Sequence, residues 1–228
     1  MAIPQGAIRK AWIDKKDEIE KTFTIASEND RPASNAPQLP DYQANIPDIG
    51  LCADGGRSAS TFWKSEGDST LRVSELFVWN LKDAKQQDPI FSPDGGRVVL
   101  PIGFSLLQVK GSFDVSTDCA CYSFFGSKLN SNSRTVHGHL FETYNSGRLD
   151  FSLSIAGPKL AYQDVSIPGT PSLQAGLDDG LPEWLQRFAG FMAGHDIHAS
   201  IRSSMVNVFA TPAFTGRMIE TLNKAIGH

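Results

Sequence analysis

Several features that identify common protein classes are scarce or missing in this sequence. The formal net charge is −4, so there is no basic excess to neutralise phosphates, and nucleic-acid binding is not expected. No window approaches 18 consecutive apolar residues, so no transmembrane segment is expected. The first residues, MAIPQGAIRKAWIDKK, lack the charged start and apolar core of a secretory signal. We therefore expect a protein that is cytoplasmic, or exported without a signal peptide.

Cysteine is also scarce, with only Cys52, Cys119 and Cys121 in the chain. A bridge between Cys119 and Cys121 would join side chains on one face of a strand, where disulfide geometry is poor. We expect the three cysteines to be small buried hydrophobic residues, with ligation of a soft metal as the alternative. Free thiols favour a reducing compartment or a leaderless route out of the cell.

Local catalytic motifs are missing as well. The sequence has no Gly-x-Ser-x-Gly elbow, no phosphate-binding Gly-rich loop, no dinucleotide fingerprint and no His-Glu-x-x-His. An enzyme is therefore not indicated. A site assembled from carboxylates on distant strands would leave no such motif, so catalysis stays open.

What is present is the composition of a folded protein, with 228 residues, 40% of them hydrophobic and 20% charged. These values predict a single α+β domain over residues 1–228. Residues 5–28 are predicted to form an N-terminal helix, because Ile8, Trp12 and Phe23 fall on one stripe. Residues 29–48 carry four prolines and are predicted to form a Pro-rich arm.

Residues 49–168 show the alternation of a β-sheet. Leu149, Phe151 and Leu153 alternate with polar residues, so one face is buried and the other wet. Turn sequences such as Asp94-Gly95-Gly96 separate the alternating stretches. Short returns favour antiparallel pairing. We expect a curled antiparallel sheet of about eight strands, by counting the alternating stretches.

Helical periodicity returns over residues 182–226. One helix is expected after Pro182, a second over 197–209 and a third from Thr211-Pro212. Their apolar stripes are wide and bulky. We therefore expect these three C-terminal helices to pack on the apolar face of the sheet.

The stretch Val136-His137-Gly138-His139 places two histidines on one face of a predicted strand. The pair resembles the first half of a cupin motif, but Glu142 comes too early and alternation sends it to the opposite face. A third ligand would have to come from His195 or His198. The default interpretation is a wet strand face, and the alternative is a divalent transition metal at His137 and His139.

Large apolar residues are more numerous than strands of this length need on one face. The simplest interpretation is a core shared by sheet and helices. The alternative is a groove between them for an apolar ligand. The candidate lining residues are Phe104, Phe113, Phe151, Phe188, Met192 and Met218.

The stretch RLDFSLSIAGPKLAYQDVSIPG, followed by TPAFTGRMIETLNKAIG, resembles the strand pair and packing helix of the tubular lipid-binding (TULIP) superfamily. The resemblance covers residues 98–228. It implies an elongated apolar cavity for lipid and no catalytic machinery, and it has no motif from which residue roles carry over.

These observations predict non-enzymatic binding of a hydrophobic or lipid ligand between the sheet and the C-terminal helices, with no cofactor. One alternative is a self-associating assembly protein or leaderless toxin component, which would contact a second copy or a partner protein through the same apolar surface and the arm. A second alternative is a metal-dependent enzyme centred on His137 and His139.

Overall fold

The computed structural model describes the chain except for residues 1–2, 28–30, 49, 53–59, 178–196 and 228. The helix expected after Pro182, with Phe188 and Met192, lies outside the described residues. Within them the structure is α+β, with eleven strands that pair antiparallel and helices from both ends of the chain.

The strands form two sheets rather than the single sheet that the sequence predicts. The order of the six-stranded sheet is β1-β3-β7-β8-β11, and β2 pairs with β7 beside this path. Its strands are β1 (Tyr42–Ile46), β2 (Thr61–Ser65), β3 (Ser69–Lys82), β7 (Leu106–Ser123), β8 (Lys128–Asn145) and β11 (Ser172–Leu177). The order of the five-stranded sheet is β10-β9-β6-β4, and β5 pairs with β6. Its strands are β4 (Lys85–Gln86), β5 (Ile90–Phe91), β6 (Arg97–Gly103), β9 (Arg148–Ala156) and β10 (Lys159–Ser166).

The chain leaves one sheet for the other at Phe104 and Ser105, inside what the sequence predicts as one strand over 97–107. The Phe104 backbone N–H donates to the Gly147 carbonyl, and the Ser105 N–H donates to the Lys82 carbonyl. These bonds turn the backbone away from the β6 ladder, so the next strand, β7, joins the other sheet. Alternation cannot reveal this crossing, because both sheets need the same period of two.

The expected boundaries of the sheet are also wrong. The predicted arm contains β1, which pairs with β3 from Tyr42↔Val73 to Ile46↔Ser69. β11 lies beyond residue 168 and pairs with β8. Both are short edge strands, of five and six residues, and at that length periodicity is a weak signal.

The N-terminal segment forms α1 (Gln5–Asp14) and α2 (Lys16–Phe23) instead of one helix to residue 28. Lys15, between them, leaves the helical conformation with φ −103° and ψ 16°. Beyond α2 the backbone is extended, because Ile25 exchanges backbone hydrogen bonds with Leu81 of β3. This pairing with a distant strand ends the helix. No glycine or proline lies at this point of the sequence to predict the end.

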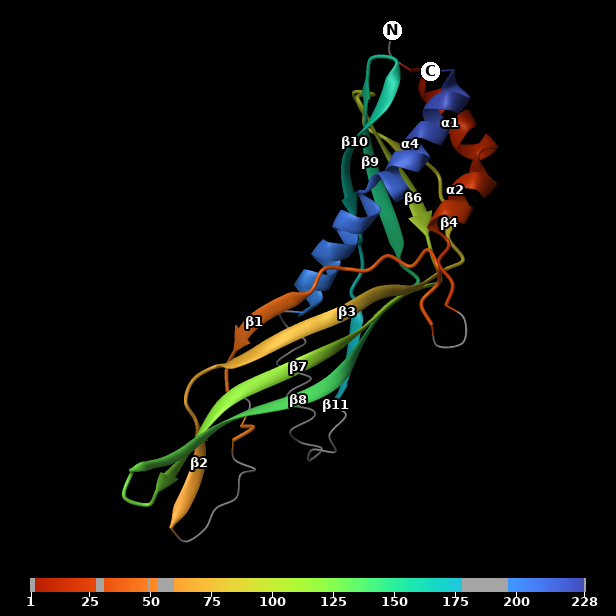
Figure 1. The fold of residues 1–228 in the computed structure, drawn as a ribbon. Coiled ribbons are helices and arrows are strands. Elements are labelled where there is room, and N and C mark those ends of the chain that lie inside the picture. The colour runs from red at the N-terminus through yellow and green to blue at the C-terminus, as the bar shows by residue number, and fades with distance from the viewer. Residues whose placement is uncertain (1–2, 28–30, 49, 53–59, 178–196, 228) are drawn as a thin grey trace.

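Two of the expected C-terminal helices lie within the described residues. Residues 197–209 are helical, as predicted. They are followed by η2 (Pro212–Gly216), a π-helical turn, and α4 (Arg217–Ile226). α4 packs against β10, α1 and α2, so the five-stranded sheet is covered by helices from both termini (Figure 1).

The core is continuous between the two sheets and the helices. The Phe23 and Phe151 rings lie 4.9 Å apart between their centroids, and those of Phe209 and Phe214 lie 5.2 Å apart. Trp12 is buried and its Nε1 donates to the Gln87 carbonyl at 2.9 Å. Helices from both ends therefore share one set of aromatic contacts with the sheets.

The cysteines correct the expectation of free thiols. Cys52 and Cys119 form a disulfide, with 5.5 Å between their Cα atoms, and only Cys121 is free. Cys119 and Cys121 share a strand face as expected. The partner of Cys119 instead comes from a segment 67 residues away in sequence, which spacing alone does not reveal.

Candidate ligand-binding site

Four of the lining residues predicted from the sequence, Phe104, Phe113, Phe151 and Met218, lie in the core, while Phe188 and Met192 lie outside the described residues. Phe113 of β7 lies over Gly138, and Phe104 lies over Gly147. Phe151 of β9 and Met218 of α4 are buried with them. Their role as ligand contacts stays a prediction, because the pockets described below have other linings.

An apolar pocket of about 470 Å³ opens where the predicted arm meets the C-terminal helical segment. We call it the helix-side pocket. Its apolar wall comes from Pro37 on one side and from Val208, Ala213 and Phe214 on the other. The remaining lining residues are Thr22, Asn35, Gln38, Thr211 and Arg217. This volume falls within the range of ordinary small-molecule sites, about 300–1,000 Å³.

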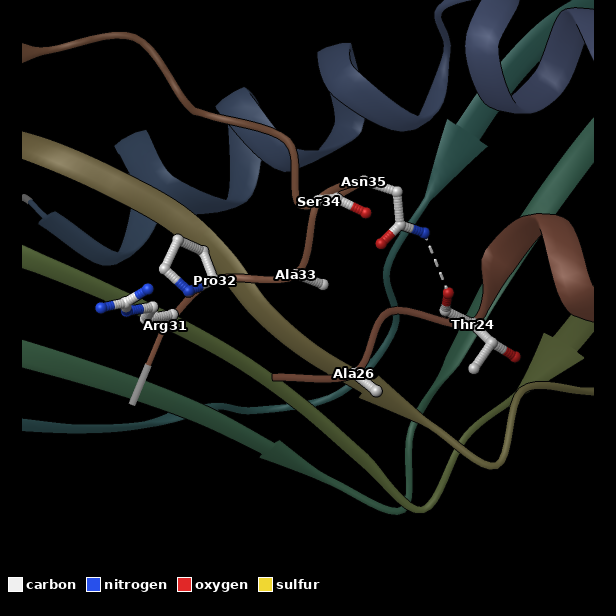
Figure 2. Close-up of a pocket in the computed structure, with 7 residues that line it drawn as sticks. All are labelled: Thr24, Ala26, Arg31, Pro32, Ala33, Ser34 and Asn35. Carbon is white, nitrogen blue, oxygen red and sulfur yellow. Dashed lines mark hydrogen bonds between the residues drawn. The ribbon is translucent and has the colours of Figure 1, made fainter. Parts of the chain in front are cut away.

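A second pocket, of about 810 Å³, lies along the same arm and is called here the loop-side pocket. It is lined by Thr24, Ala26, Arg31, Pro32, Ala33, Ser34 and Asn35 (Figure 2). Asn35 lines both pockets, and its Nδ2 donates to the Thr24 carbonyl at 3.2 Å. The two pockets therefore adjoin, one mostly apolar and the other mostly polar.

The arm is held in place as the wall of these pockets by bonds to β3. The Val78 N–H donates to the Pro37 carbonyl, and the Leu39 N–H donates to the Leu76 carbonyl. Pro37 has no N–H to satisfy, so it can face the pocket without leaving an unpaired donor. The arm is thus a fixed rim rather than a free extension.

The opposite wall is shaped by the π-helical turn. The Gly216 N–H donates to the Thr211 carbonyl, which widens the turn, and the Thr215 hydroxyl donates to the Phe209 carbonyl. The turn directs Phe214 into the aromatic core while Ala213 stays exposed at the pocket. Single-turn π-helices occur frequently at functional sites. The sequence predicted a helix here, and only the backbone shows the wider turn.

The rims carry charge. Arg31 lines the loop-side pocket and Arg217 lines the helix-side pocket, and both side chains are exposed. Beside Arg217, Glu18 accepts a hydrogen bond from Thr221 and lies near Lys15, and these contacts lower the pKa of its carboxyl. Cationic groups at the mouth of an apolar pocket suit a ligand with an apolar body and a polar or anionic end.

A buried polar cluster lies elsewhere, between β8 and the helix of residues 197–209. Glu142 is fully buried, and its Oε1 lies 3.3 Å from Nδ1 of His198. Burial raises the pKa of the Glu142 carboxyl, and Tyr144, His198 and Arg202 partly offset the rise. Alternation correctly placed Glu142 on the inner face of its strand. A carboxylate on the buried face of a strand needs a charged or hydrogen-bonding partner. The alternation of β8 was therefore the sequence signal for this cluster.

The two outward histidines have different neighbours. The Nδ1 atom of His137 lies 2.5 Å from Asp114 Oδ1, and Nδ1 of His139 lies 3.5 Å from Ser112 Oγ. His198, one of the two possible third ligands, contacts Glu142 on the other face of β8 from His137 and His139. His195 lies outside the described residues. Within the described part of the chain, no group of three or more His, Cys, Asp or Glu side chains is placed to hold a metal.

Among the residues that the structure describes, no helix has the length and apolar character needed to cross a membrane.

Comparison with known proteins gives structural neighbours only. No protein-family description and no curated protein sequence matches the chain. The structure is similar to that of lipopolysaccharide binding protein, with 13% identity and a TM-score of 0.44 over 94% of this chain. It is also similar to Takeout 1 of Epiphyas postvittana, with 9% identity and a TM-score of 0.22 over 96% of this chain and 86% of the other.

The chain spans only 39% of the length of lipopolysaccharide binding protein. Because both TM-scores are below 0.5, the likeness carries no argument about this chain. The function must be argued from the residues of this chain.

Proposed function

We propose that the protein binds a hydrophobic or amphipathic ligand, of the size of a single lipid chain, without catalysing a reaction. The observation that carries the proposal is the helix-side pocket, whose wall is formed by Pro37, Val208, Ala213 and Phe214. Binding would come from apolar area removed from water, about 25 cal/mol per Å² before ordering costs. Arg217 and Arg31 at the rims would hold the polar end of the ligand.

The site differs from the one expected from the sequence. The ligand would lie against the C-terminal helical segment and the arm, not deep between the sheet and the helices. Of the two locations expected from the sequence, export from the cytoplasm is the one proposed. The Cys52–Cys119 disulfide supports action in an oxidising environment, because such bonds are rare in the reducing cytoplasm.

The test is titration of the purified protein with a fluorescent fatty acid, supported by native mass spectrometry for ligand that copurifies. Ala213→Trp fills the helix-side pocket from an exposed position and is expected to weaken binding about tenfold, which is about 1.4 kcal/mol. Ala161→Trp, at an exposed position of β10, is the matched control and should bind like the wild type. Equal affinity in Ala213→Trp would mean that this pocket is not the site.

A photoactivatable fatty acid separates the new site from the one predicted from the sequence. Cross-links to the segment of residues 208–217 support the helix-side pocket. Cross-links at Phe104, Phe113 or Phe151 would show instead that the ligand enters the core. A wild-type protein that binds no fatty acid and carries no copurified ligand would contradict the proposed function itself.

The other two functions stay predictions. Self-association, including action as a toxin component, would appear as a molar mass that rises with concentration in light scattering. A metal-dependent enzyme at His137 and His139 requires stoichiometric Zn, Fe, Mn or Cu, which elemental analysis of the purified protein would detect.

A further inference from the structure

The far end of the β7–β8 hairpin presents the most exposed aromatic side chains among the described residues. Phe124 is 75% exposed and Phe125 is 93% exposed, and Leu129 beside them is 57% exposed. Figure 1 shows this hairpin, with β2 alongside, projecting at the end of the molecule opposite α1 and α4. We call residues 123–129 the hairpin tip.

The backbone of the tip is closed without help from these aromatic rings. The Ser123 N–H donates to the Ser127 carbonyl, and the Gly126 N–H donates to the Ser123 carbonyl. Gly126 has φ +86°, in the left-handed region where glycine carries no steric cost. The turn therefore holds Phe124 and Phe125 on its crest, with their rings edge-on at 6.0 Å between centroids.

Exposed apolar clusters on a folded protein commonly mark interaction surfaces. Phe124 and Phe125 form such a cluster. The fold does not require them, and a polar residue would fit the same turn. We propose that the hairpin tip inserts into the head-group region of a lipid bilayer, with Phe124 and Phe125 as the anchoring side chains.

The polar surroundings of the rings fit a bilayer surface. Ser123, Ser127, Lys128 and Asn130 flank the two rings in the sequence, and polar groups of this kind remain hydrated at the depth of the lipid head groups. Below the tip, the Phe62 and Tyr122 rings stack at 5.8 Å. Of these two rings Tyr122 carries a hydroxyl, and aromatic rings with a polar end are favoured at the boundary between lipid and water.

The charges at this end also permit contact with phosphate groups, although the whole chain is acidic. Lys128 forms an ion pair with Glu66, which cancels the nearest negative charge. The Lys64 ammonium lies 4.5 Å from the centre of the Tyr122 ring. The tip therefore presents no excess of negative charge that lipid phosphates would repel.

A second copy of the chain fits the tip less well than a bilayer. Each phenylalanine buries about 150–250 Å² at most, so four rings from two copies give about 600–1,000 Å². Stable protein interfaces bury about 1,200–2,000 Å². A bilayer needs no such area from the partner, because its interface accepts aromatic side chains at any lateral position.

The test is flotation of the purified full chain with phosphatidylcholine vesicles. The wild type is expected to float with the vesicles. Phe124→Ser/Phe125→Ser should lower the partition coefficient about tenfold or more, since each tenfold loss corresponds to only about 1.4 kcal/mol of apolar transfer. The matched control is Ile13→Ser/Ile90→Ser, which removes two apolar side chains that are 62% and 52% exposed away from the tip. This control should float like the wild type.

A second variant reports the location of the tip. Phe125→Trp should keep vesicle binding, and its emission should shift to the blue with vesicles relative to the wild type, while Ile13→Trp should show no shift. The proposal would be overturned by a wild type that does not float, or by a double tip variant that floats equally well. Concentration-dependent dimers that the double tip variant abolishes, without vesicle binding, would overturn it in favour of self-association.

The vesicle test does not depend on the pocket ligand. A loss of flotation in the tip variants with unchanged fatty-acid titration would separate the tip from the helix-side pocket. Conversely, Ala213→Trp should leave flotation unchanged, so each proposal can fail without the other.

Discussion

Phe151 and Phe125 are the same side chain in two opposite environments. Phe151 is 0% exposed, against Phe23 in the core, while Phe125 is 93% exposed at the hairpin tip. β8 alone shows the same contrast. From Val136 onwards it alternates between buried and less buried residues, but residues 128–133 are exposed on both faces.

The difference shows that the two ends of the long hairpin are held by different forces. The end near the helices is fixed by burial, which is strong but allows little change in side-chain volume. The far end has ladder hydrogen bonds, the ion pair of Glu66 and Lys128, and the disulfide of Cys119. Few of its side chains are needed for packing, so they are available for contact with other molecules.

The largest expected effect is that of Phe151→Ala. The free energy of unfolding should fall by about 3–5 kcal/mol, because the substitution leaves a cavity against Phe23 in a close-packed core. Urea unfolding followed by circular dichroism measures the change. A loss below about 1 kcal/mol would mean that this core collapses easily, and it would weaken the contrast between the two ends.

Removing the disulfide should have the next largest effect. Cys52→Ser/Cys119→Ser opens a link between segments 67 residues apart. The free energy of unfolding should fall by about 2–4 kcal/mol, because the unfolded chain without the bridge has more conformational entropy. Cys121→Ser is the control, because it keeps the bridge. Thiol titration of the denatured wild type should count a single free cysteine, and three would show that the disulfide does not form.

Glu142→Gln tests a buried charge within the core. Burial holds the folded-state pKa of Glu142 above its ordinary value of 4.5, so the folded state binds the proton more tightly than the unfolded chain does. Wild-type stability should therefore fall as pH rises from about 4.5 through the raised pKa, by about 1.4 kcal/mol for each unit of the rise.

The variant should lack this pH-dependent loss. Unfolding curves at a series of pH values compare the two slopes, with Glu75→Gln on an outward strand position as the control. Identical slopes in wild type and Glu142→Gln would show that His198, Tyr144 and Arg202 fully compensate the buried charge.

The smallest expected effect on stability is that of Phe125→Ala. Deleting the same ring as in Phe151→Ala should change the free energy of unfolding by no more than about 0.5 kcal/mol, because an exposed ring leaves no cavity. Thermal and urea unfolding measure it. A loss above about 1.5 kcal/mol, on the order of a core contact, would show that the Phe125 ring packs against the protein in solution. The contrast between Phe125 and Phe151 would then be wrong.

Local pattern was sufficient to predict many of the elements. Alternation from Leu149 to Ile155 predicted β9, and helical spacing from residue 197 to 209 predicted that helix, because each pattern depends on a face that must be buried. The same reasoning placed Glu142 inward and His137 outward. The helix predicted to run to residue 28 ended early, because Ile25 pairs with Leu81, and such a competition depends on a partner far away in the sequence.

The candidate site was less predictable than the elements. Phe214 was not among the residues chosen from the sequence, because its stripe suggested an ordinary helix and the wider π turn has no local signature. Pro37 was assigned to a Pro-rich arm, yet bonds to β3 make it part of a pocket wall. In both cases the deciding contacts are long-range.

By itself the sequence determined the kind of protein this is: alternating strands and amphipathic helices with enough apolar side chains to bury, little net charge and no local catalytic motif. Tertiary structure alone decided that the strands divide into two sheets, that Cys52 meets Cys119, and that the arm and the helical turn enclose a pocket. The physical reason is that the periodicity of buried side chains depends only on residues close together in the sequence. The choice of which buried faces meet depends on contacts between segments that are distant along the chain.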